Sequence, residues 1–297
     1  QGLGNDYVYV NCLDGMPENP SELAKKISDR HFGVGSDGLI LICPSDIADF
    51  QMVMYNADGS ISEMCGNGIR CVGKYVRDKG LTDKDEISVE TGAGIKYLKF
   101  FRENGETKLI TVDMGAPVLN GLDIPTVFDK NPVVAQDIEV DGVTYKTTCV
   151  SMGNPHSVVF LDKDVDLSKF DIDGIGSKFE CHPAFPRRVN AEFAKVIEPG
   201  LIEMRVYERG TGETLACGTG TCATHVAARL NGLTGDRSVV RLLGGELIIE
   251  WNGQGPVMMT GPAEFVFEGE QVAIDNIDNV QYESLCGHCY FKYKNNK

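Results

Sequence analysis

The chain has little positive charge. Of its 297 residues, 28 are Lys or Arg and 43 are Asp or Glu, so the formal net charge is −15. Proteins that bind nucleic acids or anionic membrane surfaces use clusters of basic residues against phosphate groups. The composition therefore argues against a nucleic-acid partner and against attachment to a membrane surface.

The chain also lacks a long hydrophobic run. No segment of the sequence approaches the roughly 18–20 apolar residues that a membrane-spanning helix needs. The hydrophobic content of 42% and the charged content of 24% are ordinary for a globular protein. A chain of this length has room for one large domain or for two of roughly 120–150 residues.

A disulfide framework is not indicated, although the chain has ten cysteines. The chain is too long, and the spacings are too irregular, for a small disulfide-rich scaffold. Most of the cysteines look like small buried hydrophobes, as Cys12 and Cys43 do after their apolar runs. Reduced thiols in this number predict a cytoplasmic location.

One cysteine pair lies near the C-terminus. Cys286 and Cys289 have a spacing found in thiol oxidoreductases and in half of a zinc site, so a thiol redox or zinc-binding protein is one alternative. No βαβ pattern surrounds the pair and no second ligand pair follows it. We therefore expect no metal site and interpret residues 271–297 as a C-terminal extension.

Two short segments of the sequence are copies of each other. Met64-Cys65-Gly66-Asn67-Gly68 and Ala216-Cys217-Gly218-Thr219-Gly220 lie 152 residues apart, and the same offset matches residues well beyond them. Upstream, Gly4-Asn5-Asp6 resembles Gly153-Asn154-Pro155. The chain thus reads as two related halves, each with one cysteine at the same place. Such halves can hold two thiols on opposite faces of one carbon, as a racemase or epimerase requires.

The expected fold class is α+β. We predict two pseudo-symmetric domains, each a mostly antiparallel sheet wrapped around a central helix. The first covers residues 1–115 and the second residues 116–270, with a final strand that can return to the first domain. Hydrophobic patterns predict these elements: strands at 7–11, 39–43, 51–56, 87–91, 95–100, 108–114, 149–162, 191–197, 202–208, 239–243 and 246–251, and helices at 21–30 (with Ser21 as N-cap), 68–79 and 221–231.

Each repeated cysteine precedes a predicted helix. The unpaired N–H groups and the dipole of a helix start form an anion site. A thiol in that position can have its pKa lowered from about 8.5 to about 3.5–7.5. We therefore expect two activated thiols, Cys65 and Cys217, beside a carboxylate held by two helix starts. One thiolate would remove an α-proton and the other thiol would return a proton to the opposite face, with no cofactor required.

Polar residues at matched positions extend this hypothesis. Asn56 and the Glu208–Arg209 pair end the strands before the two cysteine loops. A carboxylate and a guanidinium side by side suit a zwitterionic substrate. Asn5 and Asn154 offer amide groups, and His156 could tune the protonation of a thiol.

Over nearly its whole length the sequence resembles the diaminopimelate epimerase family. The resemblance implies a cofactor-independent enzyme that interconverts LL- and meso-diaminopimelate in lysine and cell-wall precursor synthesis, with a small-molecule substrate. It also makes a homodimer plausible, although the residues leave the oligomeric state open. The motifs that carry it are Asn56-Ala57-Asp58-Gly59-Ser60, Met64-Cys65-Gly66-Asn67-Gly68-Ile69-Arg70-Cys71, Gly153-Asn154-Pro155-His156, Val189-Asn190-Ala191-Glu192-Phe193, Tyr207-Glu208-Arg209-Gly210 and Ala216-Cys217-Gly218-Thr219-Gly220.

By this resemblance Cys65 and Cys217 are the acid/base pair, and the remaining roles follow motif by motif. The reacting carboxylate would be held by Gly66, Asn67, Gly218 and Thr219. The other amino and carboxyl groups would be recognised by Asn5, Asn56, Asn154, Asn190, Glu208 and Arg209. His156 and Glu208 would influence the pKa values of the thiols.

One departure and one alternative remain. Some members of the family have a substrate-contacting glutamine where this chain has Gly38, so that contact is absent or supplied by Ser36 or Asp37. The alternative is another cofactor-independent racemase of the same fold, acting on proline, hydroxyproline or histidine. A substrate with one carboxylate would not need Arg209 together with Asn56 and Asn190.

Overall fold

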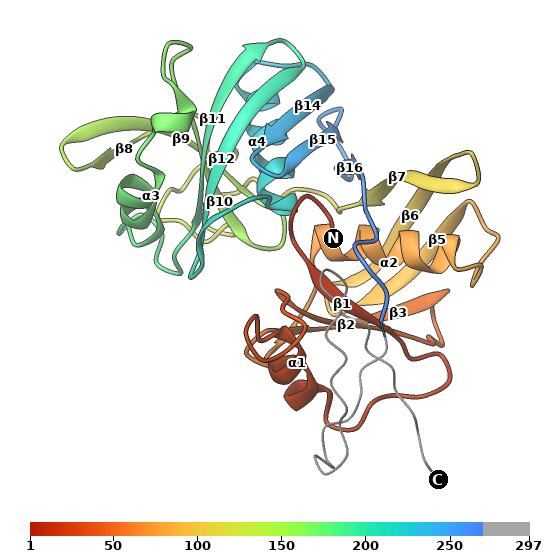
Figure 1. The fold of residues 1–297 in the computed structure, drawn as a ribbon. Coiled ribbons are helices and arrows are strands. Elements are labelled where there is room, and N and C mark those ends of the chain that lie inside the picture. The colour runs from red at the N-terminus through yellow and green to blue at the C-terminus, as the bar shows by residue number, and fades with distance from the viewer. Residues whose placement is uncertain (270–297) are drawn as a thin grey trace. The chain divides into compact units, whose positions relative to one another are not determined.

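A continuous hydrogen-bonded path of strands organises the part of the chain that the computed structural model describes, residues 1–269 (Figure 1). The predicted Cys286–Cys289 pair lies outside these residues. Residues Gln1–Glu264 form one compact unit, and a second unit begins at Phe265. None of the helices in residues 1–269 combines the length and the apolar composition that crossing a membrane takes.

The first half of the compact unit contains two helices and seven strands. They are β1 (Tyr7–Asn11), α1 (Pro20–Ser28), β2 (Gly38–Cys43), β3 (Phe50–Asn56), β4 (Ile61–Ser62), α2 (Gly66–Asp78), β5 (Glu86–Thr91), β6 (Gly94–Glu103) and β7 (Glu106–Asp113).

The second half has the same plan with two strands added at its start. Its elements are β8 (Gln136–Val140), β9 (Val143–Ser151), β10 (Pro155–Phe160), the 3₁₀-helix η1 (Leu167–Lys169), α3 (Ile172–Glu180), β11 (Asn190–Glu198), β12 (Leu201–Glu208), β13 (Gly212–Thr214), α4 (Gly218–Leu230), β14 (Arg237–Leu242), β15 (Gly245–Glu250) and β16 (Met258–Gly261).

Strand pairing repeats between the halves. In the first half, β1 and β2 are parallel, β2 and β3 antiparallel, β3 and β5 parallel, and β5, β6 and β7 antiparallel in turn. In the second half, β10, β11, β12, β14, β15 and β16 follow the same sequence of orientations. The duplication seen in the sequence is therefore a duplication of topology, and equivalent residues can be read from the strand registers.

The halves are joined through the strands that end each repeat. β7 and β16 pair antiparallel, with Thr111 opposite Thr260 and their hydroxyl oxygens 2.6 Å apart. Each half wraps its sheet around a central helix: α2 lies against β6 and β7, and α4 lies against β14 and β15 (Figure 1). Both helices are buried along most of their length, which explains their many small and apolar residues.

Several predicted boundaries were wrong for identifiable reasons. The single strand expected over residues 149–162 is two strands, because Met152-Gly153-Asn154 turns the chain between β9 and β10. Ser21 is not an N-cap; it lies inside α1 and donates to the carbonyl oxygen of Gly59. The pattern also missed β4, β8, β13 and α3, which are short or have little periodicity, and it gave no bounds for the expected final strand, β16, which pairs with β7. The division into residues 1–115 and 116–270 stays a prediction.

A buried histidine makes the stability of this fold depend on pH. His225 on α4 is fully buried with Nδ1 2.6 Å from the Ser238 hydroxyl, and burial lowers its pKa to about 4. The unfolded chain binds a proton at this residue below about pH 6.5, and the folded chain does not. The free energy of unfolding should therefore fall as pH drops from about 6.5 to about 4, by at most about 1.4 kcal/mol per pH unit from this residue.

Urea unfolding at several pH values checks this prediction. A His225→Gln variant should lose part of the acid sensitivity, whereas His31→Gln, at an exposed position, should keep it. Equal slopes for the wild type and His225→Gln would contradict the prediction.

Candidate active site

The two repeated cysteines are the N-cap residues of the two central helices. Cys65 precedes α2, and its Sγ accepts a hydrogen bond from the Gly68 N–H at 3.3 Å. Cys217 precedes α4, and its Sγ accepts from the Gly220 N–H at 3.4 Å. The predicted helix starts at Gly68 and Thr221 were therefore late, and each Cys-Gly-x-Gly segment is the first helical turn rather than a separate loop.

The two helix starts touch each other. A Cβ atom placed on Gly66 would lie 3.7 Å from the Cα of Gly218, and one placed on Gly218 would lie 3.5 Å from the Cα of Gly66. Met259 lies against both glycines, with its Cε 3.1 Å from the Gly66 position. The two helix starts therefore lie in direct contact, which brings the preceding residues, Cys65 and Cys217, to the same junction.

Side chains from the first half hold this contact. The Asn67 amide is buried and donates to the carbonyl oxygen of Ala216 at 3.1 Å. The fully buried Arg70 guanidinium donates to the Asn67 Oδ1 and to the carbonyl oxygens of Gly66 and Pro262. All of these partners are neutral groups, and the positive charge of Arg70 lowers the pKa of Cys65.

The expected activation of the thiols is not what the structure gives. Burial raises the pKa of Cys65 to about 11, although the N–H groups of Gly68 and Asn67 and the charge of Arg70 oppose the rise. Burial and the negative charge of Glu208 raise the pKa of Cys217 well above its ordinary value. Desolvation of a thiolate outweighs the helix start here. Both thiols are therefore protonated at neutral pH in this structure.

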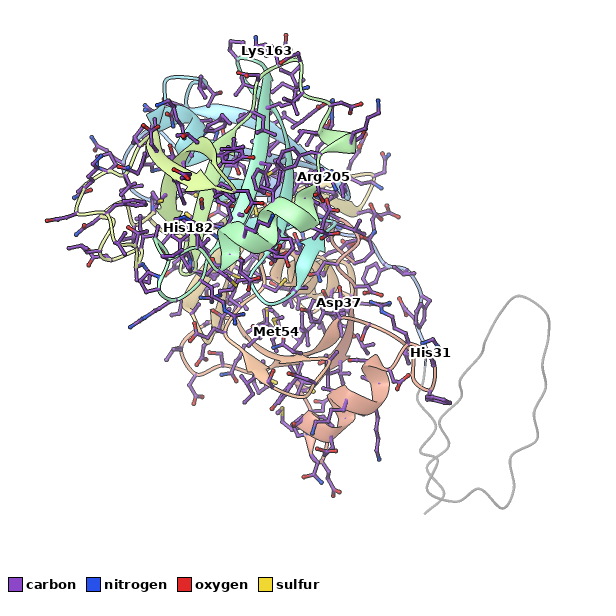
Figure 2. The ribbon with its side chains drawn as sticks, turned by 90° about the vertical axis from the view of Figure 1, so that its left-hand side faces the viewer. His31, Asp37, Met54, Lys163, His182 and Arg205 are labelled. Atoms are coloured by element: carbon purple, nitrogen blue, oxygen red, sulfur yellow. The ribbon has the colours of Figure 1, made fainter. Side chains whose placement is uncertain are left out.

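Asn5 lies beside Cys65 and is held by an acidic residue. The Cys65 thiol donates to Asn5 Oδ1 at 3.2 Å, and Asn5 Nδ2 donates to Asp37 Oδ2 at 2.7 Å. Asp37, labelled in Figure 2, comes from the loop before β2 and is paired with Arg30 at 2.9 Å. Asp37 therefore positions Asn5 by accepting from its amide.

Asn154, the counterpart of Asn5 in the second half, is held by a histidine instead of a carboxylate. His156 Nε2 lies 3.0 Å from Asn154 Oδ1, and His156 Nδ1 lies 2.6 Å from Glu192 Oε1. His156 and Glu192 are fully buried. Burial lowers the pKa of His156 to about 3, so its imidazole is neutral.

The remaining predicted residues are less closely tied to the thiols. Asn190 is buried and bonds two backbone groups, donating to the Pro155 carbonyl and accepting from the Arg209 N–H. The Arg209 side chain is exposed, and its Nη1 donates to the Arg187 carbonyl oxygen. Glu208 accepts from the Thr214 hydroxyl, and Asn56 donates to the Ser60 hydroxyl. Thr219 Oγ1 is 3.5 Å from Cys217 Sγ.

Gly38 has no room for a side chain. A Cβ atom at this position would lie 2.2 Å from the Tyr55 carbonyl oxygen and 2.7 Å from the Tyr7 ring. The Ser36 hydroxyl donates to the Gly38 carbonyl oxygen, and Asp37 is used on Asn5. The backbone of this chain is therefore incompatible with a glutamine at Gly38.

Sequence patterns missed the contacts of three polar residues of the site. Asp37, Arg70 and Glu192 support the residues that are expected to contact the substrate. A charged residue within an apolar run was the available signal for Glu192, between Ala191 and Phe193, and for Arg70, between Ile69 and Cys71. Residues 1–269 contain no group of three or more His, Cys, Asp or Glu arranged to hold a metal ion.

A family model described as diaminopimelate epimerase matches residues 1–120 and 148–266. The chain belongs to the diaminopimelate epimerase family. It is 58% identical over 270 residues to the diaminopimelate epimerase of Acetivibrio thermocellus, which covers 91% of this chain and 95% of that protein. It is 53% identical over 270 residues to that of Methanococcus maripaludis, with 91% and 96% covered.

Solved structures show the same fold at low sequence identity. A probable proline racemase from Agrobacterium radiobacter matches with a TM-score of 0.61 and 16% identity over 91% of each chain. A hydroxyproline epimerase from Agrobacterium vitis matches with a TM-score of 0.58 and 13% identity, covering 88% of this chain and 86% of that one. These likenesses confirm the predicted α+β fold.

The charge of Arg70 should be measurable at Cys65. Because that charge lowers the pKa of Cys65, Arg70→Met should raise it. The pH dependence of Cys65 alkylation, followed by mass spectrometry of its peptide, gives the midpoint. Arg77→Met, on the same helix, is the control and should leave the midpoint in place. An unchanged midpoint in folded Arg70→Met would contradict this role.

Proposed function

We propose that this chain is a cofactor-independent diaminopimelate epimerase, an isomerase that inverts one α-carbon of a small diamino dicarboxylate. One observation carries the proposal: the two N-cap cysteines stand at helix starts that touch at Gly66 and Gly218. Relatives described as diaminopimelate epimerases support the proposal, because they are 52–58% identical to this chain over 91% of its length.

The substrate carboxylate would bind at the two helix starts. The N–H groups of the first helical turns, those of Gly66, Asn67, Gly218 and Thr219, suit a carboxylate because the helix dipole favours negative charge there. The same groups stabilise the charge that develops on the carboxylate when the α-proton leaves. These four residues are the ones expected from the sequence.

Proton transfer would then use both thiols. One sulfur, as thiolate, takes the α-proton and becomes a thiol, while the opposite thiol gives its proton to the other face of the carbon and becomes a thiolate. The net change is inversion of the α-carbon. The cysteine that began as the thiolate ends as the thiol, and the other cysteine ends as the thiolate. The substrate ammonium, bonded to the same carbon, favours the thiolate by its positive charge.

Arg209 gives the specificity for a second carboxylate. Its side chain is exposed at the end of β12, next to Glu208, and has N–H groups beyond the one used on Arg187. Asn5, Asn56, Asn154 and Asn190 would supply the remaining contacts to the ammonium and carboxylate groups. A proline or histidine racemase would not need this distal recognition.

Location and assembly complete the proposal. Eight cysteines within residues 1–269 are free thiols. This agrees with a reducing, cytoplasmic compartment. We propose a homodimer on the resemblance to the family.

The two-thiol mechanism predicts that neither cysteine is dispensable. Cys65→Ala and Cys217→Ala should each lower kcat for LL- to meso-diaminopimelate by at least about 10²–10⁴-fold, because each removes one member of the acid/base pair. Cys71→Ala and Cys222→Ala, buried cysteines of the same two helices, are matched controls and should keep activity. Near wild-type turnover by either of the first two variants would exclude the pair.

The same assay run in D₂O tests how many bases act. Two opposed thiols give product that carries deuterium at the inverted carbon, while substrate recovered early keeps its protium. Retention of protium in the product would indicate a single base that returns its own proton.

Substrate specificity predicts a separate effect at Arg209. Arg209→Met should raise KM for diaminopimelate about 10- to 100-fold, the equivalent of about 1.5–3 kcal/mol for a hydrogen bond to a charged group. Arg187→Met changes a neighbouring exposed arginine whose backbone, not its side chain, contacts Arg209, and should have little effect. Turnover of proline, hydroxyproline or histidine that is unchanged by both substitutions would favour the racemase alternative.

A further inference from the structure

His156 and Glu192 form a sealed pair behind Asn154. His156 lies on β10 and Glu192 on β11, and neither side chain has any exposed surface. His156 Nδ1 is 2.6 Å from Glu192 Oε1, and His156 Nε2 is 3.0 Å from Asn154 Oδ1. Within residues 1–269, Glu192 Oε2 has no hydrogen-bond partner. The contacts form a chain that runs from the carboxyl group through the imidazole to the amide.

The carboxyl end of this chain lies against the turn that caps Cys217. A Cβ atom placed on Gly220 would be 2.7 Å from Glu192 Oε1 and 3.3 Å from Cys217 Sγ. The Gly220 N–H is also the donor to Cys217 Sγ. Because Glu192 lies this close to the turn that caps Cys217, the charge of its carboxyl group affects the Cys217 thiol.

The first half has no such pair. The strand registers place Tyr7 at the position of His156 and Ile40 at that of Glu192. Ile40 makes the equivalent contact, with its Cδ1 2.7 Å from a Cβ placed on Gly68. The first half has the aliphatic Ile40 where the second half has the carboxyl group of Glu192. An aliphatic side chain can therefore fill this layer of the core, so the carboxyl group of Glu192 has another role.

The surroundings favour a neutral carboxyl group. An unpaired charge in a buried site is strongly disfavoured. Burial, and then the negative charge of Glu208, raise the pKa of Glu192 well above its ordinary value. Burial lowers the pKa of His156 to about 3, with Glu208 opposing and Arg209 adding to that shift. The other titratable groups in reach are Cys217 and Cys149, which are both buried thiols.

We propose that Glu192 is a positioning residue of the epimerase site: its protonated carboxyl donates to His156 Nδ1, the Nε2–H of His156 donates to Asn154 Oδ1, and the Asn154 amide N–H groups are thereby left to donate to the substrate. A carboxylate at Glu192 would accept from Nδ1–H instead, and the imidazole Nε2 would then take an Asn154 N–H. The proton on Glu192 thus decides whether Asn154 meets the substrate as a donor or as an acceptor.

The neutral form also serves the second thiol. An ionised Glu192 would raise the pKa of Cys217 further by its negative charge and disfavour the thiolate. A protonated Glu192 removes that charge, so Cys217 can become a thiolate in one of the two directions of the reaction. This catalytic role rests on the proposed function, whereas the hydrogen-bond chain does not.

Histidine-selective ¹⁵N NMR of the substrate-free protein tests the chain directly. The His156 signals are assigned by their absence in His156→Gln. A neutral imidazole protonated at Nε2, in the wild type and in Glu192→Gln, is the expected result. An Nδ1–H tautomer or an imidazolium in the wild type at pH 7.5 would overturn the proposal.

Three variants test the role in catalysis. Glu192→Gln keeps a neutral donor to Nδ1 and should remain within about threefold of wild-type kcat/KM, with a pH profile that coincides or extends to higher pH. Glu192→Ile copies the side chain of the first half and should lose about 10- to 100-fold, because Asn154 is then misplaced. Glu198→Gln, at an exposed carboxylate of β11, is the matched control. Reversibility requires kcat/KM to fall by the same factor in both directions.

The outcomes separate the two proposals. A loss of tenfold or more in Glu192→Gln would show that a carboxylate is required and would overturn the inference, as would full activity of folded Glu192→Ile. A wild type without epimerase activity would contradict the proposed function, and the NMR result would still decide the hydrogen-bond chain.

Discussion

The contact between Gly66 and Gly218 is the constraint on which the site depends. The first turns of the two helices meet there backbone to backbone, and a Cβ on Gly66 would lie 3.1 Å from the Met259 methyl group, which would have to shift by a few tenths of an ångström. Each glycine follows a capping cysteine, so the contact brings together two thiols and the N–H groups of two helix starts. The pairing of β7 with β16 and the bond from Asn67 to Ala216 hold the same junction from either side.

The duplication explains the geometry of the site, and the differences between the halves explain its chemistry. Equivalent strands, helices and capping cysteines place two thiols in nearly equivalent positions. Their surroundings are not interchangeable, because Asn5 is held directly by Asp37, whereas Asn154 is held through a buried imidazole and carboxyl group. Both ends of LL-diaminopimelate carry the same groups in the same configuration, and the ends of the meso isomer differ only in configuration. Since only one α-carbon is inverted, the site must hold the other end of the substrate without reacting with it.

The sequence predicted the fold class and the cysteine pair because both leave local signals. A repeat at a fixed offset can be recognised directly in the sequence. Strands such as β1 and β3 have clear apolar patterns bounded by turn residues. Long-range partners leave no such signal. No local sequence pattern shows that Arg70 donates a hydrogen bond to the Pro262 carbonyl oxygen or that Glu192 lies against Gly220. The N–H groups of the helix starts do lower the pKa values of both thiols, but burial raises them by more, and only the packed structure determines the burial.

The high pKa values of the thiols are an advantage for this reaction. The α-proton of an amino acid is a very weak acid, so a strongly activated thiolate with a low pKa would be a poor base for it. A buried thiol keeps its basicity and becomes ionised only when positive charge arrives beside it. In the mechanism that we propose, the substrate supplies that charge as its ammonium group, while the helix starts hold its carboxylate. Since both thiols are shifted in the same direction, either can give or take the proton, as an equilibrium between two stereoisomers requires.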